Sequence, residues 1–207
     1  MDLAAAAAEL LAMRAQRRIE PDLPDELRPG DLADAYAVQA MVVDGLGAGT
    51  PIGYKCACTS PIAQAALHID RPLFGRLLPA TTSRDGATLD ADRFVHRVIE
   101  AEFGIRLAER VEPIEGGHTA ETIADYVDAV IPAIEVVDYR YESWTLGALQ
   151  VAADNAIHGW WVSAEPITEW RHLELDEVPV TVERNDAVET TGVGSNVLGH
   201  PLNVVAW

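Results

Sequence analysis

The feature that most constrains this chain is the regular alternation of side chains between Val98 and Leu107. Every second position there is apolar, and the positions are Ile99, Ala101, Phe103, Ile105 and Leu107. Successive side chains of a β-strand point to opposite faces of the sheet. The alternation therefore predicts a strand with one apolar face, and with Glu100 and Glu102 side by side on the other face.

A third carboxylate, Glu135, lies in the apolar segment I-P-A-I-E-V-V-D-Y, where a strand has little reason to hold a charge. Three carboxylates cannot gather without a counter-charge, because like charges disfavour mutual ionisation. A hard divalent cation removes the conflict, and all-oxygen ligands suit Mg²⁺ or Mn²⁺. Spacing alone leaves open the alternative of a solvated Glu100–Glu102 pair and an unrelated Glu135 at a sheet edge.

Lys55 is a second candidate for chemistry. It shares a strand face with the small residues Gly53, Ala57 and Thr59, which leaves room around its ammonium group. Such a lysine can bind a substrate carboxylate or assist proton transfer. The alternative is an ordinary solvated lysine on the surface.

The first fifty residues are predicted to be helical. Asp2 caps an N-terminal helix, and Asp31 caps a second helix that ends near Gly45 to Gly49. The apolar face of the second helix is expected to carry Leu32, Tyr36, Ala40 and Val43. We expect an N-terminal helical region over residues 1–50 and a β-rich catalytic core over residues 51–207, in an α+β fold.

The later segments alternate between strand and helix patterns. Ile52 to Thr59 is predicted as a strand, and Ser60-Pro61 as the start of a short helix. A helix is expected from Thr119 to Val130, and a strand from Ile131 to Asp138, with Pro132 marking its start or a sheet edge. Val178, Val180 and Val182 occupy every second position, which is typical of a strand, and a turn is expected after them at Asn185-Asp186.

Composition excludes several classes of protein. The net charge of −18 opposes binding to nucleic acid or to an anionic membrane surface. No apolar run is long enough to span a membrane, and the N-terminus lacks the order of a secretory signal, so a cytoplasmic protein is expected. Cys56 and Cys58 are too close for a normal structural disulfide and are interpreted as buried thiols.

Six blocks of sequence resemble one known family. They are G-Y-K-C-A-C-T-S-P, R-P-L-F-G-R-L, I-E-A-E-F-G-I-R-L, I-P-A-I-E-V-V-D-Y-R-Y, A-D-N-A-I-H-G and V-L-G-H-P-L-N-V-V-A-W. In this order they resemble the 2-keto-4-pentenoate hydratase and 4-oxalocrotonate decarboxylase branch of the fumarylacetoacetate hydrolase superfamily. The resemblance runs from about Asp31 to Trp207.

The resemblance implies a mixed β-roll behind the N-terminal helical region. It also implies roles for residues, which we retain as predictions. The metal ligands would be Glu100, Glu102 and Glu135, holding Mg²⁺ or Mn²⁺. The catalytic residues would be Lys55 and Asp154, and the substrate-binding residues would be Lys55, Leu73 and Asn155. His158 stands with Ile157 where relatives carry serines after A-D-N-A; we predict that it takes over a catalytic role, and the alternative is a loop histidine that packs on Trp160 or Trp161. Leu73 departs from the hydratases, which carry aspartate in that block.

The implied reaction is metal-dependent addition of water to a 2-oxo-4-enoate, in the catabolism of aromatic or related compounds. A metal-dependent decarboxylase of the 4-oxalocrotonate type is the alternative, and a non-catalytic partner subunit of such an enzyme is a second one. The partners expected are a small 2-oxo acid and other subunits, in a homo-oligomer or in a complex with a related hydratase or decarboxylase. No contact with nucleic acid or membrane is expected.

Two further expectations concern other parts of the chain. His68-Ile-Asp70 matches half of an iron-binding facial triad, with His158 or His200 as third ligand, but it runs directly into Arg71-Pro72 and fits a helix end and turn better. The segment ending at Trp207 has the pattern of the opening turns of a helix, with Pro201 near its first position. Relatives continue beyond this block, so the closing segment of the roll is expected to be missing here.

Overall fold

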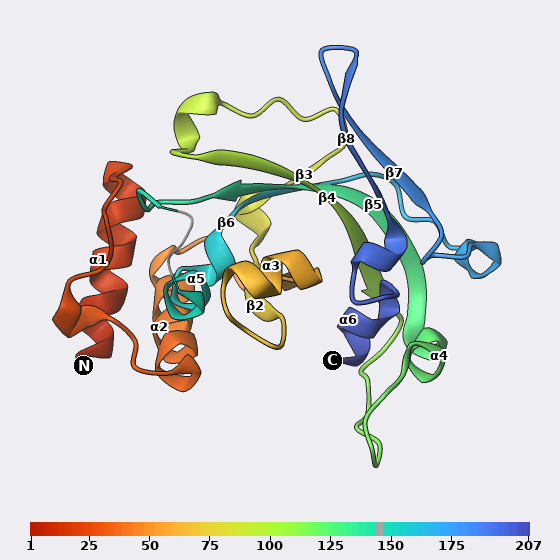
Figure 1. Cartoon of the computed structure of the whole chain (residues 1–207), viewed down its shortest axis with the longest axis horizontal. Coiled ribbons are helices and arrows are strands. Elements are labelled where there is room, and N and C mark those ends of the chain that lie inside the picture. Colours follow the sequence, from red (N-terminus) through yellow and green to blue (C-terminus); the bar gives the residue numbers. More distant parts are fainter. Residues whose placement is uncertain (144–146) are drawn as a thin grey trace.

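The two longest strands, β4 (Arg97–Leu107) and β5 (Val127–Asp138), form the centre of the molecule. The computed structural model describes residues 1–143 and 147–207. The two strands pair antiparallel in a four-stranded sheet of order β3-β6-β5-β4, which runs across the molecule (Figure 1). Strand β6 (His158–Ser163) is antiparallel to β5, and the short β3 (Thr82–Arg84) is parallel to β6. This confirms the strand predicted from the alternation at 98–107.

The register of this sheet determines where the predicted carboxylates lie. Glu100 on β4 is directly opposite Glu135 on β5, and Trp161 on β6 is opposite Glu135 on its other side. Directly paired residues of antiparallel strands project to the same face. Glu100, Glu102 and Glu135 therefore share one face of the sheet.

Two separate two-stranded sheets complete the β structure, and the α+β class is confirmed. Strand β1 (Gly53–Ala57) pairs antiparallel with β2 (Leu73–Leu77), and α3 (Pro61–Ala66), capped by Ser60, lies in the connection between them. Strand β7 (Pro179–Arg184) pairs with β8 (Ala187–Val193). The predicted turn between β7 and β8 is confirmed, since Asn185 and Asp186 have φ of 53° and 64°, as tight hairpin turns require.

Helices α1 (Leu3–Gln16), α2 (Leu32–Gly45) and α5 (Ala148–Ala153) pack together in one hydrophobic core that also contains Leu73. The caps are as predicted, because Asp2 accepts from two backbone N–H groups and Asp31 from one. The predicted face of α2 is right for Leu32 and Tyr36, which are partly buried against this core, but wrong for Ala40, which is exposed. The fully buried residues of the helix are Ala35, Val38, Gln39 and Val42. The buried amide of Gln39 explains the difference between the predicted and the observed face, because a search for apolar residues places a glutamine on the surface.

A second core lies around α4 (Ala120–Ile123) and α6 (Leu202–Ala206), on the opposite side of the molecule from α1 (Figure 1). The predicted helix from Thr119 to Val130 is wrong beyond its first turn. A 3-10 turn follows α4, and β5 already begins at Val127, because residues 127–131 pair with the far end of β4. Tertiary pairing overrides the helical spacing of these residues.

The predicted start of β5 is also wrong, because Pro132 lies inside the strand and opposite Phe103. The ladder to β6 ends at the pair Ala133–Ser163, so Pro132 lies just past the point where β5 has β6 as a neighbour. A missing N–H group is tolerated there. Among the helices that the structure describes, none has the length and apolarity needed to cross a membrane.

Candidate metal centre and active site

The carboxylates of Glu100, Glu102 and Glu135 form one cluster. Each offers an oxygen, and these three oxygens lie within 4.8 Å of one another. Glu100 is exposed, Glu102 is half-buried and Glu135 is buried, so the cluster runs from the surface into the interior. Within residues 1–143 and 147–207 it is the only group of three or more potential metal ligands. The structure thus brings together all three residues predicted as metal ligands.

Lys55 projects from β1 onto this cluster, and it is the only lysine of the chain. Its Nζ lies 3.0 Å from Oε2 of Glu135 and donates to the carbonyl of Ala156 at 2.9 Å. Burial opposes the charged ammonium, but the neighbouring carboxylates, Glu135 first, outweigh burial and raise the pKa of Lys55. Lys55 is therefore a buried ammonium that the neighbouring carboxylates keep charged, and the alternative of a solvated surface lysine is wrong.

His158 contacts the opposite oxygen of the same carboxylate. Its Nδ1 lies 2.6 Å from Oε1 of Glu135, and its Nε2 lies 3.1 Å from the hydroxyl of Thr81. A bulge in the β5–β6 ladder, in which Gly159 has no partner, brings this first residue of β6 opposite Val137. Burial lowers the pKa of His158 despite the raising effect of the Glu135 carboxylate, which favours the neutral ring. Because Glu135 can only accept, Nδ1 carries the proton.

The donor set fits a divalent cation. With all three carboxylates ionised, the single ammonium would leave two negative charges in a confined space. Burial and then the nearby charge of Glu135 raise the pKa of Glu102 to about 8, which shows how poorly the cluster tolerates its own charge. A divalent ion would balance the two charges, and oxygen ligands are those that Mg²⁺, Mn²⁺ and Ca²⁺ prefer.

A cavity of about 900 Å³ opens beside the cluster, and Lys55, Glu102 and Glu135 line one part of it. Most of the remaining lining is apolar or aromatic: Ile52, Tyr54, Phe74, Leu77, Phe103, Ile105, Ile131, Trp161, Val197, Val204, Val205 and Trp207. A second lining cation, Arg106, is paired with Asp128 at 2.5 Å. The cavity therefore combines a charged end with an apolar wall, as sites for small organic acids do.

Leu73, predicted to bind substrate, lies elsewhere. It is fully buried in the core formed with α1, α2 and α5, and it does not line the cavity. Its position at the end of β2, opposite Ala57, turns the side chain into that core. This placement favours a role in packing over the predicted contact with substrate.

Asp154 and Asn155, predicted as catalytic and substrate-binding residues, are fully buried and engaged by the protein itself. The carboxylate of Asp154 pairs with Arg14 at 2.7 Å and with Arg140 at 2.9 Å, and Arg140 also pairs with Asp138. The amide of Asn155 bonds to the backbone of Arg76. Neither residue lines the cavity. These contacts favour supporting roles over direct contact with substrate.

Sequence reasoning missed the groups that support the site. Thr81 and Arg14 belong to none of the six blocks, and Arg14 reaches Asp154 from the first helix of the chain. The carbonyl of Ala156 lies inside the block A-D-N-A-I-H-G, but no sequence pattern shows that it accepts from Lys55. Arg140 alone had a signal, since it stands in the block V-V-D-Y-R-Y. The iron-binding alternative gains no support, because His68 and Asp70 are exposed and Asp70 pairs with Arg71.

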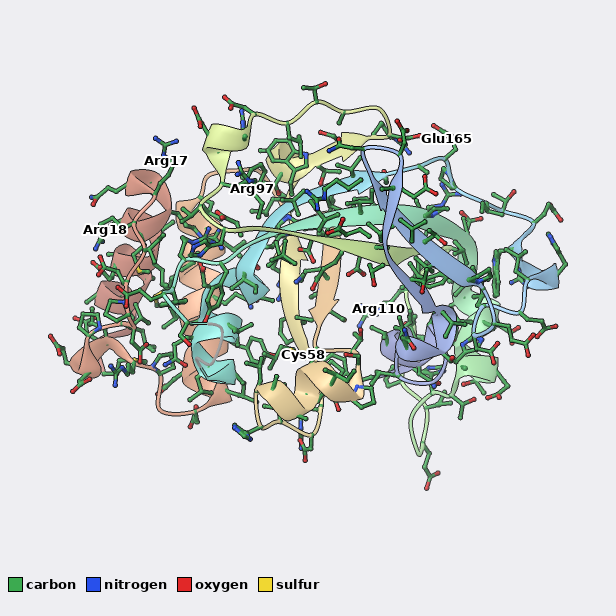
Figure 2. The ribbon with its side chains drawn as sticks, turned by 45° about the horizontal axis from the view of Figure 1, so that its top comes forward. Arg17, Arg18, Cys58, Arg97, Arg110 and Glu165 are labelled. Carbon is green, nitrogen blue, oxygen red and sulfur yellow. The ribbon has the colours of Figure 1, made fainter. Side chains whose placement is uncertain are left out.

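Both cysteines are unpaired, as predicted, and half-buried. Burial raises the pKa of the Cys56 thiol to about 11. Cys58 lies past the end of β1, beside α3 and away from the four-stranded sheet (Figure 2). Neither thiol is a metal ligand in the cluster described above.

Known proteins resemble this chain over nearly its full length. A 2-keto-4-pentenoate hydratase of Dechloromonas aromatica (strain RCB) is 32% identical over 208 residues, covering 98% of this chain and 77% of the relative. A 4-oxalocrotonate decarboxylase of Pseudomonas putida is 35% identical over 178 residues, covering 84% of this chain and 66% of the relative. No family model matches the chain.

Two solved structures that resemble this fold hold a metal ion. The 4-oxalocrotonate decarboxylase from Pseudomonas putida G7, complexed with magnesium and adipate, superposes with a TM-score of 0.90 at 26% identity. The match covers 99% of this chain and 78% of that one, and the same enzyme with calcium and acetate gives a TM-score of 0.87. The chain belongs to the 2-keto-4-pentenoate hydratase and 4-oxalocrotonate decarboxylase branch of the fumarylacetoacetate hydrolase superfamily.

Proposed function

We propose that this chain is a divalent-metal-dependent lyase that adds water across the 4,5 double bond of a 2-oxo-4-enoate of the 2-hydroxypenta-2,4-dienoate type. The observation that carries the proposal is the cluster of Glu100, Glu102 and Glu135 with Lys55 at the charged end of the cavity. A 2-oxo acid presents a carboxylate and a ketone on adjacent carbons, which suits a cation and an ammonium placed together.

Mg²⁺ or Mn²⁺ held by the three glutamates would act as a Lewis acid that stabilises negative charge developing on the 2-oxo oxygen. Glu135 keeps its orientation because Lys55 and His158 contact its two oxygens. The same contacts, opposed by burial, lower the pKa of Glu135 and keep it ionised. The proposed role of Lys55 is to pair with the substrate carboxylate and to hold a proton close to the reacting carbons.

The composition of the cavity favours hydration over decarboxylation. The substrate of a hydratase ends in an uncharged hydrocarbon tail, whereas 4-oxalocrotonate carries a second carboxylate. Away from the glutamate cluster the lining is mainly apolar, and Arg106 is already paired with Asp128. Leaving a second carboxylate in such surroundings without a partner is costly. Decarboxylation remains the alternative, because a decarboxylase with a bound dicarboxylate has closely similar structure.

The direct test is to assay the purified, Mg²⁺-loaded protein on 2-hydroxypenta-2,4-dienoate and on 4-oxalocrotonate. We expect loss of the dienoate absorbance with formation of a hydroxylated 2-oxo acid, and little release of CO₂ from 4-oxalocrotonate. Faster CO₂ release than hydration would assign the decarboxylase activity instead. A protein that binds Mg²⁺ but turns over neither substrate would be a non-catalytic partner subunit, and adding a related hydratase or decarboxylase would then be the next assay.

A further inference from the structure

The segment between α5 and β6 has an unusual backbone. Asn155, Ala156 and Ile157 form a 3-10 turn (η5) with φ of 54°, 49° and 53°, so three consecutive non-glycine residues are left-handed. This conformation costs roughly 1–2 kcal/mol per residue for L-amino acids. Strain of this kind persists only where surrounding contacts hold it, and it concentrates at functional sites.

The side chain of Asn155 supplies such contacts. Its Oδ1 accepts from the backbone N–H of Arg76 at 2.7 Å, and its Nδ2 donates to the carbonyl of Arg76 at 3.0 Å. The buried amide thus binds β2 as a neighbouring strand residue would. Gly75 makes the close approach possible, since a Cβ atom there would lie 2.5 Å from the carbonyl oxygen of Asn155.

The turn held in this way faces the metal centre. Its middle residue, Ala156, directs its carbonyl to Nζ of Lys55 at 2.9 Å, and His158 follows it directly. Lys55 and His158 are the two side chains that contact the oxygens of Glu135. Both partners of Glu135 therefore depend on the course of the backbone through this turn.

We propose that Asn155 is a positioning residue, which clamps the left-handed turn to β2 so that the Ala156 carbonyl fixes the Lys55 ammonium against Glu135. This assigns to Asn155 a task different from substrate binding. The kinetic part of the proposal rests on the proposed hydratase function, whereas the structural part does not.

The test exploits the single lysine of the chain. In protein labelled with ¹⁵N at lysine Nζ, the ammonium group gives one signal, and burial between Glu135 and Ala156 should make it resolved and slow to exchange. Asn155→Gly removes the amide but tolerates positive φ, so we expect this signal to shift or to broaden beyond detection. Turnover of 2-hydroxypenta-2,4-dienoate should fall at least tenfold, with a smaller change in KM.

Gln39→Ala is the matched control. Gln39 is also a buried amide that bonds to β2, through the carbonyl of Phe74, and to α5, through the carbonyl of Ala152, and neither of these hydrogen bonds is to the turn. The Gln39→Ala variant should lose about as much unfolding free energy as Asn155→Gly, and its lysine signal and turnover should stay near those of the wild type. If Asn155→Gly does not fold, Gly75→Ala displaces the same turn from the opposite side and should give the same change in the lysine signal.

A wild-type lysine signal in folded Asn155→Gly or Gly75→Ala would overturn the proposal. So would an equal change in the Gln39→Ala control, since the effect would then be one of general stability. If the lysine signal changes as expected while the wild-type protein hydrates no substrate, the positioning role stands and the proposed function fails. The two conclusions are therefore tested separately.

Discussion

Replacing Lys55 with methionine tests the centre of this site most directly, because it deletes the only ammonium facing three carboxylates and keeps most of the side-chain volume. At 3.0 Å and an effective dielectric constant near 20, the Lys55–Glu135 attraction is about 5 to 6 kcal/mol before desolvation is subtracted. Removing one partner of a buried pair typically costs about 3–5 kcal/mol. We therefore expect metal-free Lys55→Met to lose about 3 kcal/mol of unfolding free energy.

Metal should restore part of this loss. A divalent ion that binds the folded state at 100 times its Kd adds about 2.7 kcal/mol of stability. The Mg²⁺-loaded variant should therefore be more stable than the metal-free variant. Its turnover of the dienoate should still be at least about 100-fold slower than that of the Mg²⁺-loaded wild type, which is the low end of the effect expected for a group that transfers protons. Urea unfolding with and without Mg²⁺, and steady-state rates at saturating Mg²⁺, measure the two effects.

Arg184→Met is the matched control, since Arg184 loses its charge in the same way but from an exposed pair with Glu189 on the β7–β8 hairpin. Exposed pairs contribute up to about 1 kcal/mol, and the control should keep its activity. The reasoning is refuted if Lys55→Met retains turnover within about threefold of wild type, or if its stability loss is no larger than that of the control.

Three further predictions follow from the same structure. Glu135→Gln should abolish Mg²⁺ binding in calorimetry, because it removes the buried charge of the cluster. The exposed control Glu165→Gln should bind Mg²⁺ as the wild type does. Equal Mg²⁺ affinities of the two variants would exclude the glutamate cluster as the metal site. In a Cys58→Ser background, the Cys56 thiol should be alkylated at least 100-fold more slowly at pH 7.5 than an exposed cysteine, because its raised pKa keeps it protonated. The alkylation rate should increase as the pH rises toward 11. Rapid labelling of the folded protein at pH 7.5 would contradict this. Leu73→Asp should lower the free energy of unfolding, measured with urea, by about 4 kcal/mol or more, because it loses core packing and buries a carboxyl group. The control Leu73→Met should lower it by under about 1.5 kcal/mol. Near-wild-type stability of Leu73→Asp would place this residue outside the core.

The sequence by itself determined several local features and the identity of the metal-centre candidates. Helix caps at Asp2 and Asp31, the hairpin turn at Asn185-Asp186 and the alternation around Glu100 depend on contiguous residues, and the structure has all of them. A charge inside an apolar strand also marked Glu135 without any knowledge of its neighbours. Such signals are readable because propensity and side-chain periodicity act over a few residues.

Tertiary structure decided which groups meet. The β4–β5 register places Glu135 opposite Glu100, and only that register converts residues 127–131 from an expected helix into strand. Packing of β1 against the turn at Ala156 buries Lys55, and a bulge brings His158 to Glu135. It also buried Leu73 in the helical core and bonded the amide of Asn155 to the backbone of Arg76. Such burial and hydrogen bonds join segments far apart in the chain, so no local pattern contains them.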